Sequence, residues 1–213
     1  MEFRHLLDVV TDEPVFETGV LLAGKVDPND VRKQLSRWVR AGRLYQLRRG
    51  LYALAPPFQK VKPHPFLIAN RFVRGSYVSC QSALAYFGLI PEYVPVVTSV
   101  TAGRPGRWET PLGAYEFRHI KLELLRGYQL AELGGGQRAF LATPEKALLD
   151  LIHLHPGADR PAYLQELRLQ NPERLDLEEL HRQAERIGSP KLRRAAAWIV
   201  EWAQSAGQEY ETL

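Results

Sequence analysis

Residues 31–54 read VRKQLSRWVRAGRLYQLRRGLYAL and hold seven arginine or lysine side chains without a single carboxylate. Guanidinium and ammonium groups in such a row bind phosphate oxygens, and an arginine can also read a guanine edge through two parallel hydrogen bonds. The chemistry to consider is therefore recognition of nucleic acid, and the simpler interpretation is a solvated helix followed by a hairpin. The basic residues are Arg32, Lys33, Arg37, Arg40, Arg43, Arg48 and Arg49.

The first half of this segment has the spacing of an amphipathic helix. Lys33, Arg37 and Arg40 fall together on one side of such a helix, and Ser36 lies at the edge of that side. The apolar residues recur at i, i+4, i+7 and i+8 on the opposite side, which predicts that this stripe is buried. They are Val31, Leu35, Trp38 and Val39.

Cap and turn residues mark both ends of this predicted helix. Asp27 and Asn29 are candidate N-caps, and Pro28 suits the first helical turn. Gly42 is a natural stop at the C-terminal end, because glycine adopts the left-handed conformation without a steric penalty. The sequence therefore predicts a short helix over about 30–41 with a strongly basic free face.

A β-hairpin is predicted after the helix. The runs 44–47 and 51–54 each contain a tyrosine, a residue that favours strands. Between them stands Arg48-Arg49-Gly50, in which the glycine supplies the positive φ of a tight turn. Two arginines are thus expected at the tip of the hairpin.

Two more helices are predicted upstream, over 2–10 and over 14–23 with an end at Gly24. Three helices followed by a hairpin are the plan of a winged helix-turn-helix, whose last helix enters the major groove of DNA while the wing contacts phosphate or the minor groove. We therefore expect a DNA-binding domain over residues 1–60. The predicted contact residues are Arg32, Lys33, Ser36, Arg37, Arg40, Arg43, Arg48 and Arg49.

The charge distribution supports this interpretation. The net charge of the chain is only +4, but residues 31–91 carry 11 basic side chains and no acidic one. Residues 1–30 carry 2 basic and 7 acidic side chains, and residues 92–213 are slightly acidic. A long window without a carboxylate attracts phosphate by releasing counterions.

The remainder of the chain predicts a second domain over residues 61–213. Proline-rich turns near residue 60 indicate a linker. The fold class is α+β: an N-terminal winged helix-turn-helix, then a domain with a mostly antiparallel sheet and C-terminal helices. The predicted strands are 94–101, 108–110, 114–121, 128–133 and 138–142. The predicted helices are 65–74, 79–88, 143–155, 159–169, 176–187 and 190–206.

Enzyme chemistry and cofactors are not expected. Cys80 is the only cysteine, which excludes an internal disulfide framework and a CxxC zinc site, and it is interpreted as a buried small residue. His153 and His155 stand two residues apart on a helix, so their rings diverge and do not converge on one metal. Gly134-Gly135-Gly136 lacks a phosphate-binding pattern and is interpreted as a hairpin loop. The acidic N-terminus is not that of a signal peptide, and no long apolar run predicts a membrane span, so we expect a cytoplasmic protein.

Four segments in order resemble the AbiEi family, the antitoxins and transcriptional repressors of type IV toxin–antitoxin systems. They are LYQLRRGLYAL, YVSCQSALAYFGL, VPVVTSVTAGRP and ATPEKALLDLIHL. The resemblance implies an N-terminal winged helix that binds repeats in the family member's own promoter and represses its operon. It also implies a functional link to a nucleotidyltransferase-like toxin, which the antitoxin opposes without forming a tight complex. The lysine and arginines of helix 30–41 and of the wing would supply the DNA contacts, and we expect a monomer or a weak dimer in solution.

A protein-interaction module is the alternative interpretation. The winged helix would then mediate assembly, and the C-terminal domain would dock a partner. Salt discriminates between the two, because affinity that depends on phosphate contacts falls steeply as salt rises, whereas an apolar interface is insensitive to salt.

Overall fold

The N-terminal unit has the element order of a winged helix. The computed structural model describes residues 2–23, 26–91 and 94–211. Helix α1 (Phe3–Val10) is followed by β1 (Phe16–Glu17), the 3₁₀ helix η1 (Thr18–Leu22) and helix α2 (Pro28–Arg40). The hairpin of β2 (Leu44–Arg48) and β3 (Leu51–Leu54) completes the unit, and β1 pairs antiparallel with β3, with Phe16 opposite Tyr52. The predicted first helix, third helix and hairpin are confirmed.

The predicted helix over 14–23 is wrong. This segment forms the two-residue strand β1 and then the short 3₁₀ helix η1. Pairing of Phe16 and Glu17 with the wing keeps the first part extended, so only about one helical turn remains before Ala23. Gly24, the predicted end of that helix, lies outside the described residues.

The two faces of the wing belong to different cores. Leu44, Tyr52 and Leu54 pack with Leu6, Leu35 and other residues of α1 and α2 to form the small core of the winged unit. Leu47, Leu51 and Ala53 pack, together with Val15, into the larger core that contains the rest of the chain. The wing is therefore joined to the second part of the protein through buried apolar contacts.

In the described residues of the second part, a six-stranded mixed sheet has the order β6-β7-β5-β4-β9-β8. Three of its pairings are antiparallel (β6–β7, β5–β4 and β9–β8), and two are parallel (β7–β5 and β4–β9). The predicted strand and both predicted hairpins are confirmed, whereas β4 was not predicted. The strands are β4 (Ser76–Val78), β5 (Val96–Thr101), β6 (Gly106–Thr110), β7 (Gly113–His119), β8 (Tyr128–Glu132) and β9 (Arg138–Ala142).

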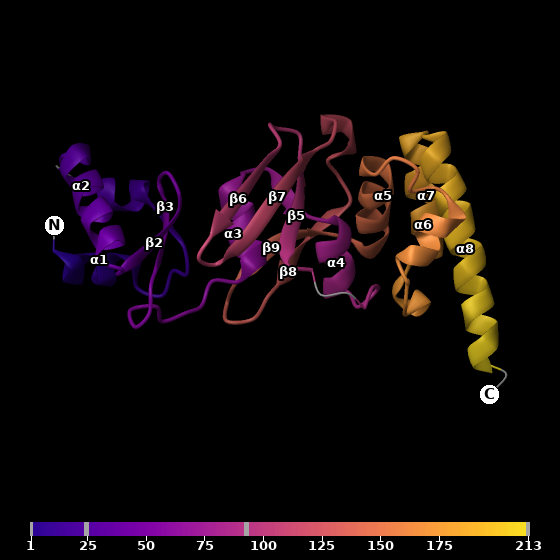
Figure 1. Cartoon of the computed structure of the whole chain (residues 1–213), viewed down its shortest axis with the longest axis horizontal. Coiled ribbons are helices and arrows are strands. Elements are labelled where there is room, and N and C mark those ends of the chain that lie inside the picture. The colour runs from indigo at the N-terminus through magenta and orange to yellow at the C-terminus, as the bar shows by residue number, and fades with distance from the viewer. Residues whose placement is uncertain (1, 24–25, 92–93, 212–213) are drawn as a thin grey trace.

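Helices cover both faces of this sheet (Figure 1). Helix α3 (Pro65–Phe72) lies on the side of the winged unit, and α4 (Cys80–Tyr86) and α5 (Pro144–Leu154) lie on the other side. Beyond α5 lie α6 (Pro161–Glu166), α7 (Leu177–Ile187) and the long α8 (Pro190–Glu211). Two short 3₁₀ helices connect elements: η2 (Leu122–Leu124) lies between β7 and β8, and η3 (Pro172–Arg174) lies between α6 and α7. The fold is thus α+β, with the winged unit at one end and the C-terminal helices at the other. No helix among the described residues is long and apolar enough to cross a membrane.

Candidate nucleic-acid interface

Helix α2 is positioned by its cap and by its apolar stripe. The Asp27 carboxylate accepts a hydrogen bond from the backbone N–H of Asn29 at 2.8 Å, which satisfies one of the unpaired donors at the start of the helix. Val31, Leu35 and Trp38 are buried, as predicted. The ring of Phe3 on α1 packs edge-on against the indole of Trp38 with the ring centroids 5.3 Å apart, so α1 fixes the rotation of α2.

The opposite side of α2 is exposed, and it carries the predicted contact residues of this helix: Arg32, Lys33, Ser36, Arg37 and Arg40. Their polar contacts are with neighbouring residues on the same helix and lie at the protein surface. Lys33 pairs with Asp30 at 3.4 Å, Arg32 donates to the Asn29 side chain, and Arg40 donates to the carbonyl of Ser36. An exposed ion pair of this kind is worth at most about 1 kcal/mol. These side chains can therefore exchange their present partners for phosphate at small cost.

Arg43 stands just beyond the helix, between α2 and β2. Its guanidinium lies 5.0 Å from the centroid of the Phe3 ring, while the side chain remains exposed. Its backbone N–H donates to the carbonyl of Trp38, and its carbonyl accepts from Ala55, so the main chain at this point is fixed on both sides. The basic surface of α2 thus continues toward the wing.

The two arginines at the wing tip point in different directions. Arg49 is exposed beside Gly50, whose φ of +82° closes the turn. Arg48 is half-buried, and its guanidinium donates to the carbonyl of Arg71 in the last turn of α3 at 3.2 Å. Carbonyls at a helix C-terminus lack intrahelical partners and attract cations. Arg48 therefore links the wing to α3, whereas Arg49 is exposed to solvent.

Ion pairs with acidic residues of the winged unit use part of the basic window. Lys60 pairs with Asp12 at 3.3 Å, and Arg74 pairs with both carboxylate oxygens of Glu17 at 2.9 and 3.0 Å. Acidic residues of the first 30 thus neutralise cations that follow the wing. The basic side chains of α2, Arg43 and Arg49 remain exposed cations of this window.

A buried polar network joins β4, the start of α4 and α5, and it was not predicted from the sequence. The Asp150 carboxylate on α5 accepts hydrogen bonds from the hydroxyls of Tyr77 at 3.0 Å and Ser79 at 2.8 Å, and it pairs with the ammonium of Lys146. Lys146 and Asp150 are almost completely buried. Ser79 is the N-cap residue of α4, as predicted, but its hydroxyl bonds Asp150 and not the helix. The available signal was the i, i+4 spacing of a lysine and an aspartate in the otherwise apolar run KALLDLI.

The pKa shifts in this network are those of a buried structural cluster. Burial raises the pKa of Asp150, and Lys146, Ser79 and Tyr77 oppose that rise. Burial, followed by the charge of Asp150, raises the pKa of Tyr77 and of the adjacent Cys80 thiol, so both stay protonated at neutral pH. A protonated thiol is a poor nucleophile. Cys80 is buried, as predicted, and no group of three or more metal-ligating side chains gathers within the described ranges.

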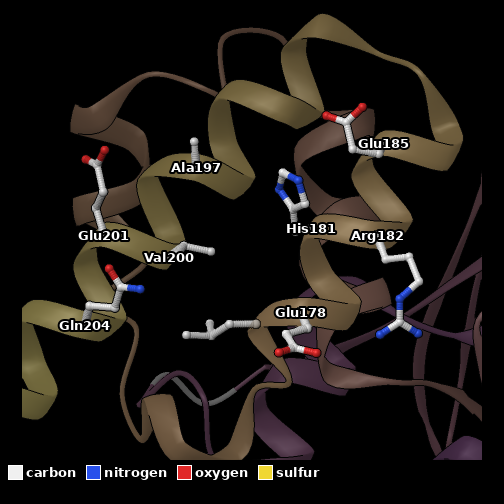
Figure 2. A pocket seen from close by; sticks show the side chains of 9 residues that line it. Glu178, His181, Arg182, Glu185, Ala197, Val200, Glu201 and Gln204 are labelled. Carbon is white, nitrogen blue, oxygen red and sulfur yellow. The ribbon is translucent and has the colours of Figure 1, made fainter.

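A shallow hollow of about 840 Å³ lies between α7 and α8 at the far end of the molecule (Figure 2). His181 of α7 and Val200 of α8 face it from opposite sides. Its lining combines aliphatic side chains with three glutamates, one arginine and one histidine. The lining residues are Leu177, Glu178, His181, Arg182, Glu185, Ala197, Val200, Glu201 and Gln204. The surface here is opposite in charge to that of α2.

Comparison with known proteins locates a match on the winged unit. Residues 26–55 match the family model described as the transcriptional regulator AbiEi antitoxin. This range includes helix α2 with its Asp27 cap and both strands of the wing. No curated protein sequence matches the chain.

Proposed function

We propose that the chain is a DNA-binding repressor of its own operon, and the match of residues 26–55 to the family model of the transcriptional regulator AbiEi antitoxin supports this proposal. The promoter repeats of that operon would be its double-stranded DNA sites. The exposed basic side of α2 supports this proposal most directly. The buried apolar stripe on the opposite side of the helix fixes its orientation. The proposed activity is binding and not catalysis, and it would take place in the cytoplasm.

In this proposal α2 enters the major groove. Arg37 and its neighbours on the exposed side of the helix approach base edges and phosphates, and Arg49 anchors the wing on the DNA backbone. Arg43 extends the phosphate contact between helix and wing. The contact set is thus Arg32, Lys33, Ser36, Arg37, Arg40, Arg43 and Arg49, with Arg48 bracing the wing against α3. A direct DNA contact by Arg48 stays a prediction.

We also propose a separate role for each of the two parts of the chain. Residues 1–60 would form the DNA-binding domain, and residues 61–213 would form the effector domain. The effector domain would oppose a nucleotidyltransferase-like toxin without forming a tight complex with it. Leu47, Leu51 and Ala53 are buried in the larger core, which supports the proposal that the two domains would act as one body on DNA.

A promoter–reporter assay tests the repressor function. The DNA upstream of the gene is fused to a reporter, and the protein is supplied from a second plasmid. The wild-type protein should lower expression and Arg37→Ala should release it, whereas Arg160→Ala, an exposed arginine at the start of α6, should repress like wild type. Unchanged reporter output with the wild-type protein, or full repression by Arg37→Ala, would argue against the proposal.

A protein-docking role for the C-terminal helices is the second candidate function. The hollow between α7 and α8 favours it, because a lining of aliphatic side chains and three glutamates fits a basic amphipathic helix. The double substitution Glu178→Lys and Glu201→Lys reverses that charge without touching α2. If docking is the principal function, this variant should lose the antitoxin effect while Arg37→Ala retains it, and the reverse result would favour the DNA-centred proposal.

A further inference from the structure

The tip of the wing is tied to the last turn of α3. The Arg48 guanidinium donates one hydrogen bond to the carbonyl of Arg49 at 3.2 Å and another to the carbonyl of Arg71 at 3.2 Å. One planar group therefore joins both carbonyls, which lie no farther apart than the width of a guanidinium and two hydrogen bonds allow. The main chains of Arg49 and Arg71 are thus held close together, although the two residues are distant in sequence.

A second contact fixes the same two segments. Glu17 lies opposite Leu51 in the pairing of β1 with β3, so it stands beside the wing. Its carboxylate accepts hydrogen bonds from Arg74, just after the end of α3, at 2.9 and 3.0 Å. The end of α3 is therefore held against the wing at two points. The fold, and not a flexible loop, sets the position of Arg71 relative to the wing.

The guanidinium of Arg71 is uncommitted. The side chain is exposed, and within the described ranges it takes part in no ion pair or hydrogen bond; only its carbonyl contacts Arg48. The nearby arginines differ in this respect. Arg74 pairs with Glu17, and Arg138 on β9 pairs with Glu132 at 2.7 Å. Arg71 thus carries a positive charge at the surface that none of these carboxylates neutralises.

The surroundings of Arg71 are basic on one side. A hollow of about 330 Å³ is lined by Arg71, Arg74 and Arg138, and no acidic residue is among its described lining residues. A second hollow of about 470 Å³, on which Arg71 also borders, includes Asp12 and Glu13. An anionic ligand of Arg71 is therefore favoured on the side of the first hollow.

From this arrangement we infer that the DNA-binding surface continues from the wing onto α3, where Arg71 binds a phosphate of the duplex beside the one bound by Arg49. The inference rests on the proposed function, because its partner is the DNA that α2 and the wing would bind. The contact is with the DNA backbone and is independent of base sequence. Helix α3 lies beyond residues 1–60 and beyond the matched range 26–55, so the second part of the chain takes a direct share in DNA binding.

The pair of cations fits a DNA strand. Phosphates follow one another along a strand at a short and regular interval, each with one negative charge. Arg49 and Arg71 offer two exposed guanidinium groups from main chains that Arg48 joins. Both residues belong to the window 31–91, which contains no carboxylate. Two neighbouring phosphates can therefore be neutralised without competition from an acidic residue of the same window.

A salt-dependent titration of the full chain with its upstream duplex tests the contact. Arg71→Ala should lower the slope of log affinity against log salt by about 0.9, the value for one phosphate, and weaken binding roughly eightfold at about 0.1 M salt. A scrambled duplex should show the same loss, because a phosphate contact carries no sequence information. Arg186→Ala is the matched control, since Arg186 is also an exposed arginine in the last turn of its helix, and it should bind like wild type.

The outcomes separate this inference from the proposed function. A wild-type protein without salt-sensitive DNA binding overturns both. If wild type binds with a steep slope and Arg37→Ala weakens it, while Arg71→Ala keeps the wild-type slope, only the contact at α3 is wrong. Arg71→Lys keeps the charge and should keep the slope. An equal fall in slope for Arg71→Lys and Arg71→Ala would show a structural role and overturn the phosphate contact.

Ethylation interference locates the phosphate. Ethylation neutralises single phosphates of the duplex, and binding falls where the protein contacts the modified position. Arg49→Ala and Arg71→Ala should each lose one such position, and the two lost positions should be neighbours on the DNA backbone. An Arg71→Ala pattern identical to that of wild type, or lost positions far apart on the duplex, would overturn the inference.

Discussion

Helices α2 and α5 both begin with a proline in the first turn behind a capping side chain, Asp27 for α2 and Thr143 for α5. They differ in what lies around them. In α2 only one stripe is buried, and the charged residues project into solvent. In α5 every residue from Glu145 to Ile152 is buried, so its charged residues must find partners inside the protein.

This difference shows where the protein can use charge to bind a ligand. Lys146 and Asp150 satisfy each other and hold Tyr77 and Ser79, so their charges contribute to the positioning of β4, α4 and α5. On α2, Arg32 donates to the Asn29 side chain and Arg40 donates to the Ser36 carbonyl, both within the same helix and at the surface. A basic residue therefore indicates nucleic-acid binding only when its helix leaves that face uncovered, as α2 does.

The largest expected effect comes from breaking the buried pair of α5. Asp150→Ala leaves the Lys146 ammonium buried without a counter-charge, and we expect a loss of about 3–5 kcal/mol in the free energy of unfolding. Urea denaturation measures it. Asp30→Ala, which breaks the exposed pair on α2, is the matched control and should cost less than about 1 kcal/mol. Equal losses for the two variants would remove the contrast between the helices.

The next effect concerns the free face of α2. Arg37→Ala should weaken binding to the cognate DNA by about 1–3 kcal/mol, roughly 5- to 150-fold, because it removes a base contact. The thermal stability should change little, since the side chain is exposed. Fluorescence anisotropy with a labelled duplex measures the affinity. A variant that binds like wild type would show that Arg37 does not face the DNA.

A smaller effect separates the two arginines of the wing. Arg49→Ala should weaken binding to all duplexes alike and reduce the salt slope by about one. Arg48→Ala should instead lower the free energy of unfolding by about 1 kcal/mol, because the hydrogen bond to the Arg71 carbonyl is lost. If Arg48→Ala changes only DNA affinity and leaves stability intact, the bracing role is wrong and the direct contact is correct.

The smallest expected effect is a pH dependence from His64. This residue caps α3: its ring Nδ1 accepts the backbone N–H of Phe66 at 3.1 Å, which requires the neutral ring. Burial lowers the pKa of His64 from 6.5. The stability it contributes is therefore complete above pH 6.5 and is lost as the pH falls through the lower folded-state pKa. His64→Asn keeps a good cap without a titrating group, so its unfolding midpoint should show a flatter pH profile between neutral and mildly acidic pH.

The sequence predicted those elements whose signals are local. The stripe of Val31, Leu35 and Trp38 and the turn at Gly50 specify α2 and the wing without help from distant residues. Thr143 caps α5 by accepting the backbone N–H of Lys146 at 3.3 Å, as its position before Pro144 indicates. These elements carry the predicted DNA contacts.

The elements that escaped prediction depend on distant partners. Phe16 and Glu17 are extended because β3 pairs with them, although the apolar residues around them suggested a helix. Strand β4 has only three residues and exists because β5 and β9 lie on its two sides. The position of Arg48 depends on a carbonyl 23 residues away in α3. No local pattern encodes such contacts.

We propose that the exposed basic surface of α2 and the wing recognises specific DNA. The direct measurement is a titration of the purified protein against its own upstream DNA and a scrambled duplex of equal length, at low and at moderate salt. We expect tighter binding to the upstream DNA and a steep loss of affinity with salt for both duplexes. Absence of binding at low salt, or equal and salt-insensitive binding to both duplexes, would contradict it.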